Sequence, residues 1–440
     1  MKILIAAYAC IPNEGREEGT GWNCSWQLAQ LGHEVWVLTP VENLVEIEKV
    51  LASNPQPNLH IVPVAHPAWM TGYKRYIPNK LWSILHYMAW QKRAYDAAQL
   101  LDNVYGFDVV HHLTIGSLQA ASPLWRLKKP FVFGPCGGGQ VAPSAFKKYF
   151  LKWWGAEVLR TLFLNKLILL NPFSPKKYSH IDLALVTNQE TADLAKKLGV
   201  RRVELVLDNA LPENYYPPAP PTRSTSKELR LLWIGKLIPR KALLLVLQAL
   251  AKVNPSIPFK LTILGSGSLD NYVPGWLKEY ALEEKVECLG HVSWAEVKNA
   301  YVSNDVFLFT SLRDSFGVQL LEAMSQALPI ITLNHHGARD FVPENAAIKI
   351  PVNNPEETIV ALTQAIENMY QNPEKRLEMG RVGYEFSKTQ TWSLKAKDIS
   401  HFYEKISAPI EVEKTCLLVN EEPIFQPHPE ERGFKTGGWV

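Results

Sequence analysis

Two acidic side chains, Asp314 and Glu322, have types and a spacing that suit sugar chemistry. Seven residues separate them, and both follow the apolar run 305–309, which is typical of a buried parallel strand. Pro329 ends the short helix that is predicted around Glu322. A carboxylate accepts two hydrogen bonds side by side, so it suits neighbouring hydroxyls of a ribose or hexose. The pattern predicts a sugar site at the end of a strand, and a solvated helix with two surface acids is the alternative.

Two lysines, Lys236 and Lys241, flank the loop that follows another predicted strand, residues 229–235. Cations placed there can converge on a diphosphate as it leaves a sugar. A solvated cationic loop is the alternative, and Arg240 is most simply a surface residue. Two cations and a helix terminus would make a divalent metal unnecessary, and the sequence has no Asp-x-Asp pair of the metal–diphosphate type. We therefore expect no metal and no cofactor.

The phrases Asp314-x-Phe316-Gly317 and Glu322-Ala-Met resemble the E-x7-E signature of retaining GT-B glycosyltransferases of family GT4. Asp314 stands where most members have Glu, and Lys236 stands where most have Arg. The resemblance implies two Rossmann-like domains that face a cleft, with a UDP- or GDP-linked sugar in the second domain and the acceptor in the first. It also implies retention of the anomeric configuration by a same-face substitution through an oxocarbenium-like state, in which the leaving phosphate accepts the acceptor's proton.

The same resemblance assigns roles to residues. Glu322 would bind the nucleotide ribose, Asp314 the donor sugar hydroxyls, and the two lysines the diphosphate. The implied catalytic set is His111, His112, Lys236, Lys241 and Asp314. The implied donor-binding set is Gly19, Gly21, Gly235, Lys236, Lys241, Gly265, His291, Val292, Asp314, Phe316, Gly317, Val318 and Glu322. The acceptor side would comprise Tyr8, His111, Gly137 and Gly138.

The first half of the chain opens with a predicted strand, a long loop over residues 8–21 and a helix over residues 22–31. Gly19 and Gly21 lack the third glycine of a dinucleotide fingerprint, and the loop is too long for one. A loop that enters a helix N-terminus can still face an anion, and a tight turn with a helix cap is the alternative. The helix from Asn79 is expected to pack Leu81, Leu85, Met88 and Ala89 inward.

His111 and His112 end a predicted strand, a position that favours chemistry or substrate contact, and either could be the functional one. A metal site at this pair is less attractive because no acid or Cys stands at ligand spacing. The glycine loop 137–139 lets a backbone approach a ligand closely, although it could be only a turn. Residues 335–340, His-His-Gly-Ala-Arg-Asp, follow a later strand and are either a nucleotide-side loop or structural.

Residues 144–177 combine aromatic, apolar and cationic side chains, with Glu157 as the only acid. That composition suits a helix on an anionic membrane surface, which a lipid-linked acceptor would need. A core helix with a solvated basic face is the alternative. No apolar run reaches the ~18–20 residues of a membrane-spanning helix.

Length and composition are those of a globular α/β protein. The 440 residues are 47% hydrophobic and 20% charged, and the net charge of +3 gives no argument for nucleic acid as a partner. Five scattered cysteines favour a reducing compartment. We expect domains at 1–211 and 229–387, a linker at 212–228, a helix crossing back at 388–407 and a loosely ordered acidic tail at 408–440.

Together with these features, the resemblance to GT4 enzymes implies a GT-B glycosyltransferase that is cytoplasmic or peripheral at the inner membrane face. It would move a sugar from a nucleotide-diphosphate sugar to a glycan or lipid-linked acceptor in cell-surface polysaccharide or glycolipid synthesis. Two alternatives stay open. One is another GT-B enzyme, such as a sugar-nucleotide epimerase, and the other is a non-catalytic membrane-surface binding protein with a degenerate GT-B core.

Overall fold

The computed structural model describes residues 1–408 except 69, 71–78, 120–121, 171–176 and 224–226. Residues Met1–Ser407 form one compact unit. The predicted acidic tail falls almost wholly on residues 409–440, which lie outside the described residues.

The first sheet has seven parallel strands in the order β3-β2-β1-β4-β5-β6-β7. Their bounds are β1 Lys2–Ala6, β2 Glu34–Pro40, β3 Leu59–Val64, β4 Val109–His112, β5 Phe131–Cys136, β6 Leu183–Val186 and β7 Val203–Leu205. Helices cover both faces, so the central strands are apolar throughout. One face packs against α1 (Arg16–Gln30), α2 (Leu44–Ser53) and α15 (Trp392–Ser407), and the other against α3 (Asn79–Tyr105) and α7 (Gln189–Lys197).

The second sheet has six parallel strands in the order β10-β9-β8-β11-β12-β13. Their bounds are β8 Leu229–Ile234, β9 Phe259–Leu264, β10 Val286–Gly290, β11 Val306–Phe309, β12 Ile330–Leu333 and β13 Ala347–Ile350. One face packs against α8 (Leu243–Leu250), α9 (Val273–Glu279) and α13 (Pro355–Gln371). The other packs against α10 (Trp294–Ser303), α11 (Val318–Ser325), α12 (His336–Phe341) and α14 (Pro373–Lys388).

Both sheets reverse their strand order next to their first strand, between β1 and β4 and between β8 and β11. Loops leave such neighbouring strands in opposite directions, so a crevice opens at their carboxyl ends. The prediction of two Rossmann-like, doubly wound parallel sheets is confirmed.

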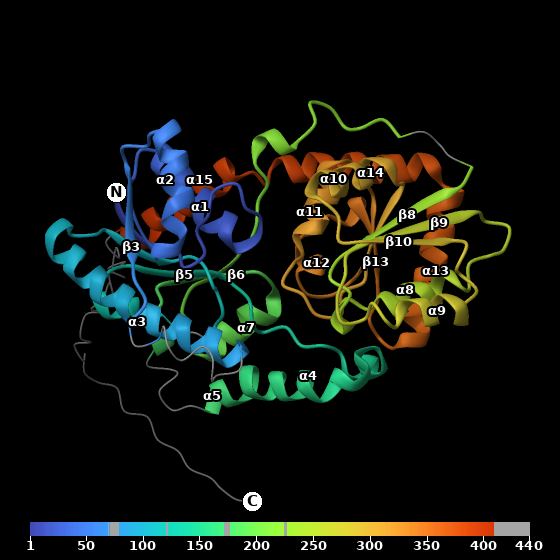
Figure 1. The fold of residues 1–440 in the computed structure, drawn as a ribbon, viewed down its shortest axis with the longest axis horizontal. Coiled ribbons are helices and arrows are strands. Elements are labelled where there is room, and N and C mark those ends of the chain that lie inside the picture. Colours follow the sequence, from blue (N-terminus) through green and yellow to red (C-terminus); the bar gives the residue numbers. More distant parts are fainter. Residues whose placement is uncertain (69, 71–78, 120–121, 171–176, 224–226, 409–440) are drawn as a thin grey trace, which may run out of the picture. The chain divides into compact units, whose positions relative to one another are not determined.

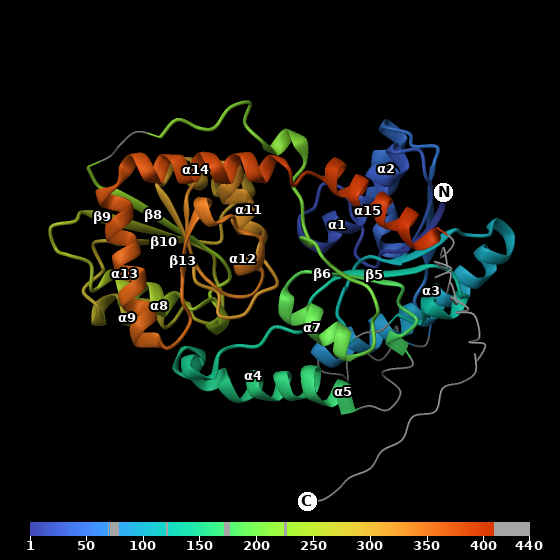
Figure 2. The same cartoon turned by 180° about the vertical axis from the view of Figure 1, so that it is seen from behind.

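The last helix, α15, returns to the first sheet (Figures 1 and 2). Its Trp392, Ile399 and Tyr403 are buried in the core that α1 and α2 share with that sheet. The preceding α14 packs on the second sheet, where Gly380 approaches the backbone of Ala327. The domain limits at residues 211, 228 and 387 stay predictions.

Residues 144–170 are not one amphipathic helix. They comprise a 3-10 segment (Ser144–Trp153), α4 (Trp154–Thr161), a π-helical turn (Leu162–Leu167) and α5 (Ile168–Leu170). Phe146, Tyr149 and Phe150 are buried in the core of the second sheet, and the Tyr149 hydroxyl donates to Gln248 of α8 at 2.6 Å. The aromatic half of the segment is therefore protein core, which corrects the expectation of a membrane-surface helix for that half. Among the described residues, no helix has the length and apolarity that crossing a membrane requires.

Two local predictions for the first half are wrong. The loop predicted over residues 8–21 is shorter, because α1 begins at Arg16. Leu85 and Met88 of α3 face solvent, while Tyr87 and Trp90 are buried against the sheet instead. The two aromatic rings carry more apolar area than the leucine and methionine, so their face of the helix packs inward.

The predicted linker is anchored to the second sheet's helices by Arg223. Its guanidinium donates to the carbonyls of Tyr301, Gln326 and Ala327 at 2.8, 2.6 and 3.1 Å. These carbonyls lie in or just beyond the last turns of α10 and α11, where helix geometry leaves acceptors without an intrahelical donor. The part of the linker that ends at Arg223 is thus held in place.

Candidate functional site

The loops after β8 and β11 bring Lys241 against Asp314 at the switch point of the second sheet. A 3-10 helix, Pro239–Lys241, follows β8, and the loop over residues 310–317 follows β11. Because these two strands are neighbours, residues that follow them meet at one edge. The Lys241 ammonium makes an ion pair with the Asp314 carboxylate and lies 4.8 Å from the centre of the Phe309 ring.

The cations of Lys241 and Arg240 hold the Asp314 carboxylate in its ionised state, whereas burial lowers the pKa of Lys241. The Lys241 side chain is 9% exposed and that of Asp314 is 21% exposed. Burial alone would raise the pKa of the Asp314 carboxyl, but the adjacent Lys241 and Arg240 lower it to about 2. The cluster is a fixed arrangement of one carboxylate and two cations, suited to a ligand that carries both hydroxyls and negative charge.

Arg240 is a member of this cluster, so the prediction of a surface role is wrong. Its guanidinium lies 3.2 Å from the Asp314 carboxylate and donates to the Arg313 carbonyl at 2.7 Å. The neighbouring Arg313 is held in turn by Glu157 of α4, with Nε and Oε1 2.6 Å apart. The single acid of segment 144–177 thus fixes the loop that carries Asp314.

Lys236, in contrast, is exposed and makes no ion pair with any described residue. It follows β8 directly, on the same loop as Lys241. The two predicted lysines thus differ in their surroundings, because Lys241 is enclosed and paired whereas Lys236 is exposed.

Glu322 lies on α11 with a hydrogen-bond donor behind it. The hydroxyl of the fully buried Tyr301 donates to its Oε2 at 2.8 Å. A second buried hydroxyl, that of Tyr215, lies close enough that burial and the Glu322 carboxylate raise its pKa. Leu320, Leu321 and Met324 are buried on the same helix. The helix thus presents its acid away from the core, and sequence reasoning missed both tyrosines.

Several predicted donor-side residues shape the backbone. Gly317 has a φ of 100°, and a Cβ there would lie 2.5 Å from the Phe309 ring. A Cβ on Gly265 would lie 1.9 Å from the Gly235 carbonyl oxygen. Phe316 is buried, with its ring 5.9 Å from that of Phe341. The remaining predicted positions are Val318 at the start of α11, His291 exposed after β10, and Val292 packed beside the core.

A cavity of about 260 Å³ opens at the carboxyl ends of the first sheet's strands. Its walls come from α1 and from the segments after β4, β5, β6 and β7, together with Arg160 of α4 and Ser315 of the second half. The predicted acceptor-side residues Gly137 and Gly138 line it, and a Cβ on Gly137 would lie 2.8 Å from the Ser315 hydroxyl. The glycine loop is therefore a wall of the cavity and not only a turn.

Gly19 and Gly21 do not line this cavity. The sequence predicts them in an open loop, and the structure corrects this prediction by placing them in a helix. Both lie in the first turns of α1, where a Cβ would lie 2.2 Å from the Glu14 carbonyl and 2.0 Å from that of Ala9. Thr20, between them, does line the cavity. Tyr8, predicted on the acceptor side, is not among the residues that line the cavity. It lies in an aromatic cluster, with its hydroxyl 3.2 Å from Nδ1 of His86.

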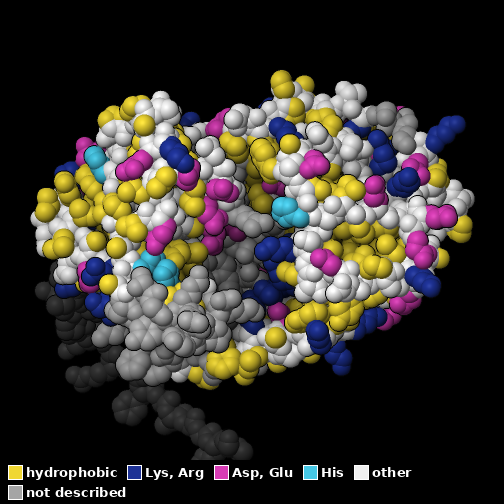
Figure 3. Space-filling model, viewed as in Figure 1, with side chains coloured by type: hydrophobic (Ala, Val, Ile, Leu, Met, Phe, Trp, Pro, Cys, Tyr) yellow, Lys and Arg dark blue, Asp and Glu magenta, His cyan; other side chains and the backbone are white. Residues whose placement is uncertain are grey.

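Two acids that sequence reasoning did not single out also face the cavity. Glu17 is exposed and also lines the cavity. The restricted hydration of its carboxyl there, together with the nearby acids Glu18 and Asp208, raises its pKa to about 7. Burial, with Asp314 among the nearby charges, raises the pKa of Asp208. Figure 3 shows acidic side chains on one side of the central hollow and Lys and Arg on the other.

His111 and His112 are both fully enclosed, so their predicted place in the cleft is wrong. The Nδ1 of His111 lies 2.5 Å from the Tyr403 hydroxyl, and its Nε2 lies 2.6 Å from the Gly134 carbonyl. Burial lowers the pKa of His111 to about 4 and that of His112 to about 3. Both still lie within β4, whose faces are covered by helices, and the cavity begins only after that strand, at Leu113.

Comparisons with known proteins point to one family. Residues 220–386 match the family model described as Glycosyl transferases group 1. The gpi3 subunit of phosphatidylinositol N-acetylglucosaminyltransferase from Schizosaccharomyces pombe is 25% identical over 188 residues, which are 42% of this chain and 40% of that protein. The GPI3 subunit of the enzyme of the same name from Saccharomyces cerevisiae is 24% identical over 267 residues, 58% of this chain and 56% of that one. The chain thus spans about half the length of these curated relatives.

Solved structures share the fold over nearly the whole chain. Sucrose-phosphate synthase from Thermosynechococcus elongatus superposes with a TM-score of 0.61 at 18% identity, covering 92% of this chain and 98% of that one. HepE of Anabaena, solved with UDP and glucose, superposes with a TM-score of 0.57 at 13% identity, covering 92% and 100%. With the two sheets described above, these likenesses confirm the GT-B fold.

Proposed function

We propose that this protein is a retaining, GT4-type glycosyltransferase, because residues 220–386 match the family model described as Glycosyl transferases group 1. It would move a hexose-type sugar from a UDP- or GDP-linked donor to a glycan or lipid-linked acceptor. The observation that carries the proposal is the cluster of Lys241, Arg240 and Asp314 at the β8–β11 switch point. Cations and a carboxylate, held together at the place where α/β sheets bind ligands, match a sugar joined to a diphosphate.

The donor side would work through charge placement. The leaving diphosphate gains negative charge as the glycosidic bond breaks, and Lys241 and Arg240 would stabilise it, with Lys236 reaching in from the exposed part of the same loop. Asp314 would accept hydrogen bonds from sugar hydroxyls, and Glu322, oriented by Tyr301, would accept those of the ribose. The freed phosphate oxygen would take the proton of the attacking acceptor hydroxyl. No step needs a metal or a cofactor at this cluster.

The acceptor would enter the cavity of the first half. Its wall carries the backbone of Gly137 and Gly138, with the acids Glu17 and Asp208 close by. Acids that bind hydroxyls suit a polyhydroxylated acceptor, and Ser315 brings this wall next to Asp314. His111 and His112 would support the strand from inside and would not touch the substrate.

A lipid-linked acceptor would require contact with a membrane surface, and one exposed apolar face supports this. It consists of the following side chains on α4, the π-helical turn and α5: Val158, Leu159, Leu162, Phe163, Leu169 and Leu170. Each is at least 40% exposed, and Leu170 is 75% exposed. The exposed Lys147, Lys148 and Lys152 precede the face and would meet anionic headgroups at a cytoplasmic membrane face. The relatives' name, with its phosphatidylinositol, favours testing lipid acceptors.

The experiment that tests the proposal is a thermal-shift panel of nucleotide sugars on the full chain, followed by product analysis with each stabilising donor. A donor that binds raises the melting temperature, and the Asp314→Asn variant should lose that rise. Release of free UDP or GDP only in the presence of an acceptor would support transfer. Release without acceptor, or conversion of the donor sugar in place, would favour an epimerase. Binding to vesicles with no response to any nucleotide sugar would overturn the proposal in favour of a degenerate binding protein.

A further inference from the structure

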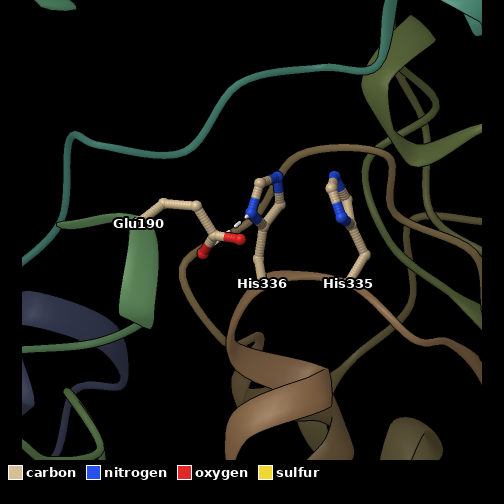
Figure 4. A group of neighbouring side chains, drawn as sticks. All are labelled: Glu190, His335 and His336. Atoms are coloured by element: carbon tan, nitrogen blue, oxygen red, sulfur yellow. Dashed lines mark ion pairs between the residues drawn. The ribbon is translucent and has the colours of Figure 1, made fainter. Parts of the chain in front are cut away.

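Three side chains that can ligate a metal converge where α7 of the first half meets the start of α12 of the second half (Figure 4). Glu190 comes from α7, and His335 and His336 come from the end of the β12–α12 loop. One ligand atom from each lies within 4.8 Å of the other two. The proposed transfer reaction uses none of them.

His336 is buried and Glu190 and His335 are half-buried, and both histidines keep a ring nitrogen without a hydrogen-bond partner among the described residues. Among the described residues, no hydrogen-bond partner contacts Nε2 of His335 or Nε2 of His336. Nδ1 of His336 meets Oε2 of Glu190 as an ion pair. The side chain of His336 is 3% exposed, so water does not supply the missing bonds freely. Buried polar atoms are almost always satisfied in proteins, and two ring nitrogens without a partner in one cluster therefore need a cause.

The spacing suits tetrahedral coordination. Nδ1 of His336 lies 3.3 Å from Oε2 of Glu190, an ion-pair contact. Two ligand atoms bound to one Zn²⁺ at about 2.0–2.1 Å in a tetrahedron are separated by about 3.3 Å. In Figure 4 the Glu190 carboxylate points at the His336 ring, and the His335 ring stands beside it.

Supporting contacts orient two of the three groups. The His335 ring makes a hydrogen bond to the backbone of Val141, which leaves Nε2 as the unused nitrogen. Ligating histidines in metal sites characteristically hold their other nitrogen in this way. The other oxygen of Glu190, Oε1, lies 2.9 Å from the Arg339 guanidinium, which fixes the carboxylate but withdraws negative charge from it.

We infer that Glu190, His335 and His336 form a binding site for a divalent transition-metal ion such as Zn²⁺, which ties α7 of the first half to the β12–α12 loop of the second. Three protein ligands leave a fourth position for water. The ion would lie beside the Asp314 loop, because the Gly337 amide donates to the Ser315 carbonyl at 2.9 Å. Its role would be to hold the two halves together.

The test is metal binding by the full-length protein without any nucleotide sugar. Metal-stripped protein is titrated with Zn²⁺ by calorimetry, and with Co²⁺ while visible absorption is recorded. We expect one ion per chain, a rise in melting temperature on Zn²⁺ addition, and the strong visible bands of four-coordinate Co²⁺.

Variants separate the site from adventitious binding. His336→Asn keeps a residue that tolerates the positive φ of 48° at this position, and Glu190→Gln leaves both histidines in place. Each should weaken Zn²⁺ binding by at least about tenfold, the loss that even a supporting contact produces. Arg339→Gln should tighten it, since the competing positive charge is removed. The matched control is His401→Ala, which removes the exposed histidine of another His–Glu pair, 61% and 63% exposed, and should leave binding unchanged.

Zn²⁺ binding that is absent in the wild type, or equal in wild type, His336→Asn and Glu190→Gln, would overturn the inference. Weaker Zn²⁺ binding in Arg339→Gln would also overturn the inference, because Glu190 and Arg339 would then be members of an ordinary ion-pair network. None of these readouts uses glycosyl transfer, so failure of the metal site and failure of the proposed activity can be told apart.

Discussion

The ammonium of Lys241 pairs with the carboxylate of Asp314, a residue 73 positions later in the chain. Each comes from a loop at the carboxyl end of one of two neighbouring strands, β8 and β11. The pair is mostly buried, so removing one partner leaves the other charge without its main compensation. This contact joins the two motifs that sequence reasoning placed in the donor site.

Replacing Lys241 by Met should abolish most of the activity. The substitution keeps the length and apolar stem but removes the cation facing the leaving phosphate, so kcat should fall by roughly 10²–10³-fold, the usual loss for one transition-state donor. Steady-state kinetics with the identified donor measure it. Lys236→Ala should lose less, because Lys236 is exposed and unpaired among the described residues.

Lys349→Met is the control for this change. Lys349 is also nearly buried, with a side chain 6% exposed and an ion pair to Glu344 of 2.6 Å in the same half of the chain. Its loss should lower stability without a matching loss of kcat. Full activity in the Lys236 and Lys241 double variant would refute the role assigned to both lysines.

Acid should weaken the fold through Asp314. Its pKa is about 2 in the folded protein against 3.8 for an unperturbed Asp, so its ionisation stabilises the fold above about pH 4 and that contribution disappears as the pH falls toward 2. The difference in unfolding free energy between wild type and Asp314→Asn should therefore shrink by up to about 2 kcal/mol between pH 6 and pH 2. Urea unfolding at a series of pH values measures it, and a pH-independent difference would contradict the ion-pair account.

Tyr301 should set the nucleotide affinity through Glu322. Tyr301→Phe removes the hydroxyl that donates to Oε2 and leaves the carboxylate less well oriented, at a cost of about 1 kcal/mol or roughly fivefold in Kd. Isothermal titration with the free nucleotide measures this. Tyr384→Phe is the matched control, since its hydroxyl donates to the Pro217 carbonyl at 2.7 Å. This control should lower the stability of the protein but not its nucleotide affinity. Equal losses of affinity in both variants would mean that Tyr301 has no specific role in nucleotide binding.

Asp314→Glu tests whether this acid selects the donor sugar. The extra methylene brings the carboxylate closer to a bound sugar but strains its pairing with Lys241 and Arg240. The ratio of kcat/KM values for two donors that differ at one hydroxyl should change, whereas free UDP or GDP should bind as before. An unchanged ratio with reduced overall activity would mean that Asp314 only holds the cations.

The second half of the fold follows closely from its sequence. The apolar run 305–309 contains the strand β11, and the predicted short helix around Glu322 is α11, which ends at Ser325, four residues before the predicted stop at Pro329. The proximity of Lys241 and Asp314 is predictable because a doubly wound order places the first and fourth strands of such a unit side by side. Because the two strands are neighbours, two motifs that lie far apart in the sequence form one site.

Other parts depend on contacts that no local pattern reveals. The sequence predicts His111 in the cleft because it is near a strand end, but β4 runs through His112 and both are enclosed. The link from Tyr301 to Glu322 and that from Glu190 to His336 join residues from separate loops and helices. Periodicity alone also does not predict which face of α3 packs inward, because Tyr87 and Leu85 lie on two different apolar faces.

The apolar face on α4 and α5 should carry any binding to membranes. Phe163 is 55% exposed and Leu170 is 75% exposed, so Phe163→Ser with Leu170→Ser removes two of its larger apolar contacts at little cost to the core. Co-sedimentation with vesicles containing anionic phosphatidylserine should fall several-fold for this double variant.

Leu100→Ser with Val104→Ser is the control, because these α3 side chains are 70% and 74% exposed and lie outside that face. Equal vesicle binding by wild type and both double variants would assign the membrane contact elsewhere. Self-association in place of vesicle binding, lost in the same Phe163 and Leu170 variant, would make the face a contact between two copies of the chain.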